Sequence, residues 1–145
     1  MYRTILVPTD GSAPADAALD RAIELAETYD ATLRILSVVD IGDAGMLSPE
    51  SAPVDGVRRS LRGRAEQLVD DAAERAAEAG VRTETEVTIG IPHVEILDAA
   101  AEAGADLVVM GTHGRTGLKR ALIGSVTERV VRRCDAPVLT VRAGE

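Results

Sequence analysis

Short apolar runs alternate with segments of helical periodicity along this sequence, and that alternation is the feature that most restricts the fold. Thr4–Pro8 is almost continuously apolar and ends in the turn residues Thr9–Ser12, which is typical of a strand buried on both faces. Apolar residues then recur at helical spacing from Ala15 to Ala26, with Ser12 as the expected N-cap. Strands followed directly by helices indicate a parallel sheet with right-handed crossovers.

The pattern of strand and helix repeats to the end of the chain. The further strands that we expect are Leu33–Val39, Val81–Ile89, Leu107–Met110 and Pro137–Val141. The further helices that we expect are Val57–Ala76, with a stop at Gly80, Pro92–Ala103, with a stop at Gly104, and Ser125–Arg133. Arg82, Glu84 and Glu86 alternate with less polar residues, which favours a strand near a sheet edge. The sequence therefore predicts one α/β domain over residues 1–145, an open parallel five-stranded sheet with helices on both faces.

Charge and composition exclude several classes of function. The formal net charge is -8, so the overall field repels DNA phosphates and anionic membrane surfaces. Tyr2 and Tyr29 are the only aromatic residues, which leaves almost nothing on which nucleic-acid bases could stack. Cys134 is the single cysteine and suits a reducing compartment. We expect no nucleic-acid partner, no membrane association and a cytoplasmic location.

Two segments that follow strands hold the residues that could bind a ligand, because ligands of open α/β sheets bind at the carboxyl ends of the strands. The first is Pro8–Ser12, which includes Asp10. The second runs from Gly111 to Ser125 and is rich in glycine. No carboxylate occurs between Leu107 and Thr127, although the chain as a whole is acidic. An anionic ligand is therefore expected at the second segment.

The glycine-rich segment has the chemistry of a phosphate cradle. Glycines let backbone N–H groups approach a ligand, and the helix start at Ser125 adds unpaired N–H donors with a partial positive charge. Arg115, Lys119 and Arg120 could add ionic contacts, or could be solvated side chains. The segment lacks the Gly-Lys-Ser/Thr ending of a Walker loop, so another kind of nucleotide site is needed. A purely structural use of the glycines, as a long turn, stays open.

The spacing of these glycines resembles the nucleotide-binding signature of the universal stress protein family. The signature is Gly111, two residues, Gly114, nine residues, then Gly124 and Ser125. Further stretches resemble family patterns over essentially the whole chain: Ile5–Ser12, Gly90–Pro92, Met110–Arg115 and Cys134–Val141. Members with this glycine signature typically bind ATP, so the resemblance implies the ATP-binding branch.

The resemblance implies a fold and a set of site residues. The implied fold is Rossmann-like, of the adenine nucleotide alpha hydrolase-like type, with strand order 3-2-1-4-5. That order brings the two ligand segments together where it reverses. The implied phosphate contacts are Gly111, Gly114, Gly124, Ser125, Val126 and Thr127. The implied ribose and adenine contacts are Pro8, Thr9, Asp10, Val39 and Met110. The implied ligand is ATP with Mg²⁺, and the implied assembly is a homodimer through the C-terminal strand.

The sequence leaves alternative roles open for several of these residues. Asp10 has the acceptor groups for ribose hydroxyls or a hydrated Mg²⁺ ion, but it could also be a turn residue that caps the first helix. His113 is the nearest candidate for acid–base chemistry in a slow ATPase or phosphotransferase, yet no carboxylate in its loop would orient it. His93 is interpreted as an exposed residue. A phospho-receiver domain does not fit, because Lys119 precedes the last helix. The leading hypothesis is an ATP-binding regulatory module of a stress response.

Overall fold

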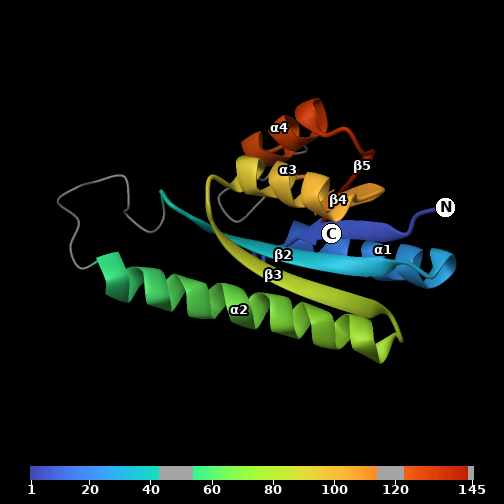
Figure 1. The fold of residues 1–145 in the computed structure, drawn as a ribbon, viewed down its shortest axis with the longest axis horizontal. Coiled ribbons are helices and arrows are strands. Elements are labelled where there is room, and N and C mark those ends of the chain that lie inside the picture. Colours follow the sequence, from blue (N-terminus) through green and yellow to red (C-terminus); the bar gives the residue numbers. More distant parts are fainter. Residues whose placement is uncertain (43–53, 114–122, 144–145) are drawn as a thin grey trace.

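A computed structural model of the chain describes residues 1–42, 54–113 and 123–143. The elements are, in chain order, β1 (Thr4–Pro8), α1 (Ala13–Tyr29), β2 (Thr32–Asp40), α2 (Val54–Glu78), β3 (Arg82–Gly90), α3 (Pro92–Ala103), β4 (Leu107–Gly111), α4 (Ser125–Arg133) and β5 (Val138–Val141). All neighbouring strands are parallel, in the order β3-β2-β1-β4-β5 (Figure 1). The predicted fold class and strand order are confirmed.

The helices form a layer on each face of the sheet, α1 and α2 on one and α3 and α4 on the other (Figure 1). Alternate residues of each strand feed the two cores. In β2, Leu33 and Ile35 pack with residues of α1 and α2, whereas Leu36 packs with residues of α3 and α4. Because β1 and β4 are covered on both faces, they are almost entirely apolar, as the continuous hydrophobic runs predict.

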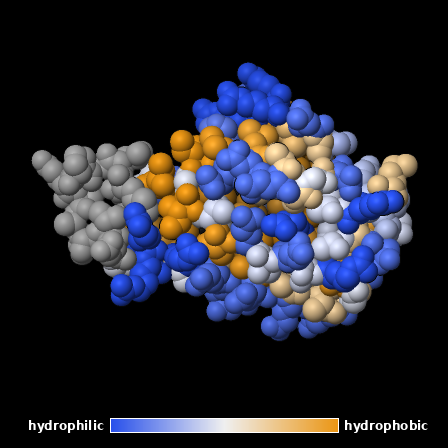
Figure 2. Space-filling view, viewed as in Figure 1, coloured by the Kyte–Doolittle hydropathy of each residue, from blue (hydrophilic) through white to orange (hydrophobic). Residues whose placement is uncertain are grey.

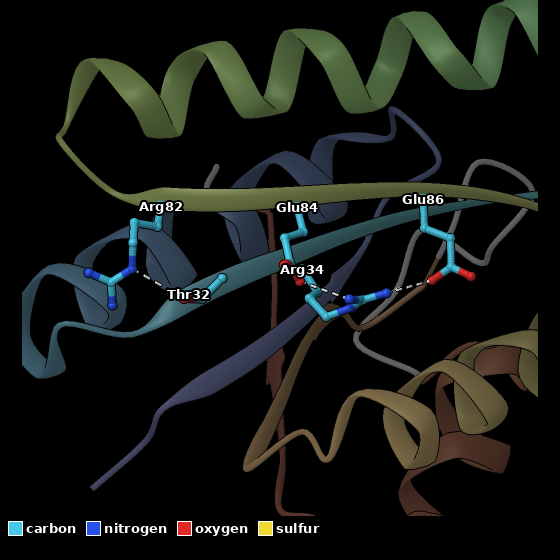
Figure 3. A network of polar contacts seen from close by, with 5 residues as sticks. All are labelled: Thr32, Arg34, Arg82, Glu84 and Glu86. Carbon is cyan, nitrogen blue, oxygen red and sulfur yellow. Dashed lines mark hydrogen bonds and ion pairs between the residues drawn. The ribbon is translucent and has the colours of Figure 1, made fainter.

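The outer strand β3 confirms the edge position that its alternating charges indicate. Arg34 of β2 is ion-paired across the strands with Glu84 at 2.8 Å and Glu86 at 3.2 Å, and Arg82 bonds to Thr32 at 3.4 Å (Figure 3). These side chains lie on the sheet face opposite α2 (Figure 3). The polar network thus covers a part of the sheet that lacks a full helical layer.

Asp106 joins the amino ends of β1 and β4. Its carboxylate accepts hydrogen bonds from the backbone N–H of Arg3 at 2.8 Å and of Thr4 at 3.0 Å. Both bonds lower the pKa of the Asp106 carboxyl from its ordinary value, because they stabilise the charged form. The bond from Arg3 has the larger effect. β1 is therefore fixed beside β4 at its start, and the two strands end side by side.

None of the helices within the described ranges is long and apolar enough to cross a membrane.

Candidate functional site

The two ligand segments expected from the sequence meet where the strand order reverses. β1 pairs with β2 on one side and with β4 on the other, so the segments that follow β1 and β4 leave the sheet side by side. Gly111, the last residue of β4, packs directly against the first turn of α1 at Pro14 and Ala15. The carboxyl edge at β1 and β4 is the place at which ligands of such sheets bind.

The turn after β1 uses its own side chains to satisfy its backbone N–H groups. The Thr9 hydroxyl accepts from the Gly11 N–H at 3.2 Å, and Asp10 Oδ1 accepts from the Ser12 N–H at 3.0 Å. Ser12 is the N-cap of α1, as predicted, and its hydroxyl accepts from the Ala15 N–H at 3.3 Å. The backbone N–H groups of this turn thus have acceptors within the turn itself. Asp10 is its half-buried acidic residue.

The start of α4 has no such side-chain acceptor among the described residues. Its N-cap is Gly124, which has no side chain, and no side chain among the described residues caps the helix. The Gly124 N–H bonds to the Thr112 carbonyl at 2.6 Å, which fixes the helix start against the end of β4. The first N–H groups of an α-helix have no partner within the helix. The N–H groups of Ser125, Val126 and Thr127 therefore lie at the positive end of the helix dipole, and no described side chain caps them.

Thr127 supports this arrangement with its side chain. Thr127 is 3% exposed, and its hydroxyl donates a hydrogen bond of 2.8 Å to the Gly111 carbonyl. The bond ties the first turn of α4 to the last residue of β4. Gly111, Gly124 and Thr127 thus form one local unit.

Close packing explains why glycine stands at positions 111 and 124. A Cβ atom at Gly111 would lie 2.7 Å from Pro14 Cβ and 2.8 Å from the Pro14 carbonyl carbon, which is too close for a side chain. A Cβ atom at Gly124 would lie 3.1 Å from both Cα and Cβ of His113. Gly111 is therefore needed to pack β4 against α1, a reason that the sequence interpretation did not include.

A shallow hollow of about 40 Å³ adjoins the first turn, between the carboxyl end of β2 and α2. Asp10 and Val39, which the resemblance assigns to the ribose and adenine, both line it. Val39 is 4% exposed. The remaining lining residues are Ser37, Val38 and Asp40 of β2, and Leu61, Arg64, Ala65 and Leu68 of α2.

The α2 wall of this hollow was missed by the sequence interpretation of the site. Leu61, Ala65 and Leu68 belong to an apolar helical stripe that predicts core packing and nothing more. Arg64 is an exposed residue in a run of arginines, and nothing in the sequence marks it as facing Asp10.

Met110 does not join Val39 at the hollow. It is 4% exposed and lies in the core cluster with Leu6, Leu36 and Ile96, on the α3 and α4 face of the sheet. Val39 packs with Ala65 of α2 on the opposite face. Pro8 and Thr9 lie at the end of β1 beside Leu36, to which the Thr9 N–H donates at 2.8 Å.

Several expected site residues lie outside the described residues. They are Gly114 of the glycine signature and the basic residues Arg115, Lys119 and Arg120.

His113 lies beside the start of α4. Its Nδ1 atom is 3.4 Å from the Thr112 hydroxyl, which is the one hydrogen-bonding partner of its ring within the described ranges. Across the same part of the chain, no group of three or more His, Cys, Asp or Glu residues is placed to hold a metal ion.

Comparisons with known proteins extend over the whole chain. The family model described as "Universal stress protein family" matches residues 1–142. The universal stress protein MJ0531 of Methanocaldococcus jannaschii is 37% identical over 142 residues, which cover 98% of this chain and 83% of that protein. The solved structure of MJ0577 from the same organism superposes with a TM-score of 0.88 at 30% identity, covering 100% of this chain and 99% of that one. A universal stress protein solved in complex with cAMP superposes with a TM-score of 0.69 at 30% identity, covering 99% and 98%.

Proposed function

Since the chain belongs to the universal stress protein family, we propose that residues 1–145 form a single domain that binds ATP and acts as a regulatory module in a stress response. One observation carries the proposal. The start of α4 has no side-chain cap among the described residues and faces the carboxyl edge of the sheet next to the β1 turn. Backbone donors at a helix start that have no side-chain cap within the described ranges suit the phosphates of a nucleotide.

The phosphate end of the ligand is assigned to the glycine-rich side of the site. The N–H groups of Ser125, Val126 and Thr127 would bind the phosphate oxygens, and Gly124 would let the chain approach closely. Gly111 and Gly114 complete the glycine signature of this end. The absence of carboxylates between Leu107 and Thr127 supports the assignment, because a nearby carboxylate would repel the phosphates.

The ribose and base are assigned to the β1 side of the site. The Asp10 carboxylate has the acceptors for the ribose hydroxyls, with Pro8 and Thr9 beside it. Val39 lines the hollow beside Asp10 and is assigned to the adenine end of the ligand. Met110 contributes to this proposal as a buried support beneath the site. Mg²⁺ would come with the nucleotide and neutralise part of the phosphate charge.

An adenine nucleotide is the favoured ligand class. The relative solved with cAMP binds such a ligand, and it shares the fold over 99% of this chain. The glycine signature made of Gly111, Gly114, Gly124 and Ser125 resembles that of family members that bind ATP, so we assign ATP as the ligand.

Calorimetry with ATP and Mg²⁺ tests the proposal, after any co-purified nucleotide has been removed and identified. We expect saturable binding at about one site per chain, and loss of that binding in Gly124→Val, whose side chain would block the approach of the phosphates. Gly63→Val is the matched control, because a Cβ atom at Gly63 meets nothing within 4 Å. Folded wild-type protein that does not bind ATP, or a folded Gly124→Val variant with wild-type affinity, would contradict the proposal.

We propose that the module is regulatory rather than strongly catalytic. His113 lacks a carboxylate partner within the described ranges, which leaves it without the group that orients a general base. We therefore expect ADP release in the presence of Mg²⁺ to be slow and equal in wild type and His113→Ala. A large loss of ADP release in His113→Ala would instead establish a slow ATPase.

We propose that two copies pair through β5, and that the protein acts in the cytoplasm. β5 is an edge strand, and its Leu139 is 37% exposed, whereas the opposite edge carries the ion pairs of β3. An exposed apolar edge favours pairing with a second chain. Light scattering is expected to give the mass of a dimer for wild type and of a monomer for Leu139→Glu. A monomeric wild type at micromolar concentration would contradict the pairing.

A further inference from the structure

The surface of α4 is positively charged although the protein is acidic. Ser125–Arg133 contains Arg129, Arg132 and Arg133 but only one carboxylate, Glu128, whereas the whole chain has a net charge of -8. Figure 2 shows strongly hydrophilic residues gathered over α4 at the top of the view. A local patch of opposite sign attracts ligands that the rest of the molecule repels.

Arg129 and Arg133 have no carboxylate partner among the described residues. Arg132 is ion-paired with Glu128 at 3.1 Å. Arg129 and Arg133 are exposed and make no ion pair with any described residue. They stand four positions apart, so they lie on one side of the helix, one turn from each other. Ion pairs also involve Arg21, Arg34, Arg62, Arg75 and Arg82.

His93 completes this cluster from the neighbouring helix. α3 packs against α4, and His93 lies half-buried in the first turn of α3, which corrects the exposed position expected from the sequence. Burial lowers the pKa of the His93 imidazole, and the charges of Arg129 and Arg133 lower it further. Those two guanidinium groups are the charged groups whose field acts on the imidazole within the described ranges. A ligand that neutralises Arg129 and Arg133 would therefore remove part of the effect that lowers the pKa of the His93 imidazole.

We propose that Arg129, Arg133 and His93 form a docking surface for an acidic peptide segment of a partner protein. Guanidinium groups bind carboxylates through paired, charge-assisted hydrogen bonds, so two adjacent arginines match two nearby Asp or Glu side chains. This surface lies outside the nucleotide site and does not rest on the proposed function.

The size of the patch favours a short acidic segment over a long polyanion. DNA and anionic membranes present extended arrays of charge, which would also meet the acidic remainder of the molecule. A peptide with a few carboxylates engages the patch alone.

Fluorescence anisotropy with a labelled octaglutamate peptide tests the surface. We expect wild-type protein to bind the peptide, and the double variant Arg129→Glu/Arg133→Glu to lose about tenfold or more in affinity. The control is Arg21→Glu/Arg62→Glu, which changes the charge equally at two arginines of α1 and α2 that are already paired. We expect the control to lose less than about threefold, since it alters only the general field. Absence of binding in wild type, or equal losses in both double variants, would overturn the proposal.

The titration of His93 gives an independent measurement that a general charge effect does not reproduce. Peptide carboxylates on Arg129 and Arg133 would offset their positive field, so we expect the pKa of His93, followed by NMR, to rise when octaglutamate binds. Inorganic phosphate at the same anion concentration serves as the comparison. An unchanged pKa with the peptide, or an equal rise with phosphate, would overturn the assignment, the latter in favour of a small-anion site. Thermal unfolding of each variant verifies that it is folded.

Discussion

The turns that follow β1 and β4 have the same place in the fold, but they differ in how their backbone donors are satisfied. At the β1 turn, the side chains of Thr9, Asp10 and Ser12 accept from the N–H groups that would otherwise face a ligand. At the start of α4, Gly124 has no side chain with which to do so. The comparison teaches that position at the carboxyl edge of the sheet does not by itself make an anion site. We propose that the backbone donors at the start of α4, which no described side chain caps, supply what the β1 turn lacks.

The largest effect is expected from a side chain at the boundary between the two turns. Gly111→Ala places a methyl group 2.7 Å from Pro14 Cβ and 2.8 Å from the Pro14 backbone. We expect the free energy of unfolding to fall by about 3 kcal/mol, because backbone atoms cannot move aside cheaply. Urea denaturation measures it, with Gly63→Ala as the control. A loss of less than about 1 kcal/mol would show that the two turns are not rigidly packed.

A smaller effect is expected from the bond that holds α4 to β4. Thr127→Val removes the hydroxyl that donates to the buried Gly111 carbonyl at 2.8 Å. We expect a loss of about 1.5 kcal/mol in the free energy of unfolding, because the carbonyl loses its donor away from water. We also expect weaker ATP binding, since the first turn of α4 is no longer fixed. Unchanged stability would mean that the hydroxyl contributes nothing to this unit.

Removal of the cap at the β1 turn sharpens the comparison. Ser12→Ala deletes the hydroxyl that accepts from the Ala15 N–H, and we expect a loss of about 1 kcal/mol in the free energy of unfolding. ATP affinity is expected to stay within about twofold of wild type, because these donors serve α1 rather than the ligand. A large change in ATP affinity, measured by calorimetry, would contradict the view that the donors of the β1 turn serve α1 rather than the ligand.

The smallest effect is expected at the opposite end of the same two strands. Because the pKa of Asp106 is lowered in the folded state, its contribution to stability is present above its unfolded pKa of about 3.9. That contribution is lost as the pH falls through the lower, folded pKa. Asp106→Asn should therefore make stability less dependent on pH below about pH 4, with a modest change at pH 7. Thermal unfolding between pH 2 and pH 7 measures it, and identical profiles would contradict the role of the carboxylate.

The helices and strands could be predicted from local sequence patterns, whereas the order of the strands could not. Apolar runs such as Leu107–Met110 and the helical stripes between them are local patterns, so the elements could be predicted directly. Ser12 as the N-cap is equally local and is confirmed. The order of the strands came from the resemblance to a family, since spacing alone does not specify which strands pair.

Features that depend on the meeting of distant segments could not be predicted in this way. Arg64 faces the hollow only because α2 crosses the end of β2, and His93 is half-buried only because α3 packs against α4. The need for glycine at position 111 arises from Pro14, nearly a hundred residues earlier in the chain. Met110 was expected to form an apolar wall of the nucleotide site. Side chains alternate between the two faces of β4, and that of Met110 lies in the core beneath α3 and α4.

The central place of β1 determines when during protein synthesis the sheet can be finished. Residues up to Gly90 leave the ribosome first and contain the strands β1, β2 and β3, with the helices α1 and α2 that cover one face of them. One side of β1 then has no neighbour until Leu107–Gly111 has been made. A nascent chain halted before that point exposes a bare apolar strand in what should be the middle of the molecule, the kind of edge that recruits chaperones or aggregates. β4 and the start of α4 are both translated after Gly90, so the proposed nucleotide site can form only once this open side of β1 has been covered.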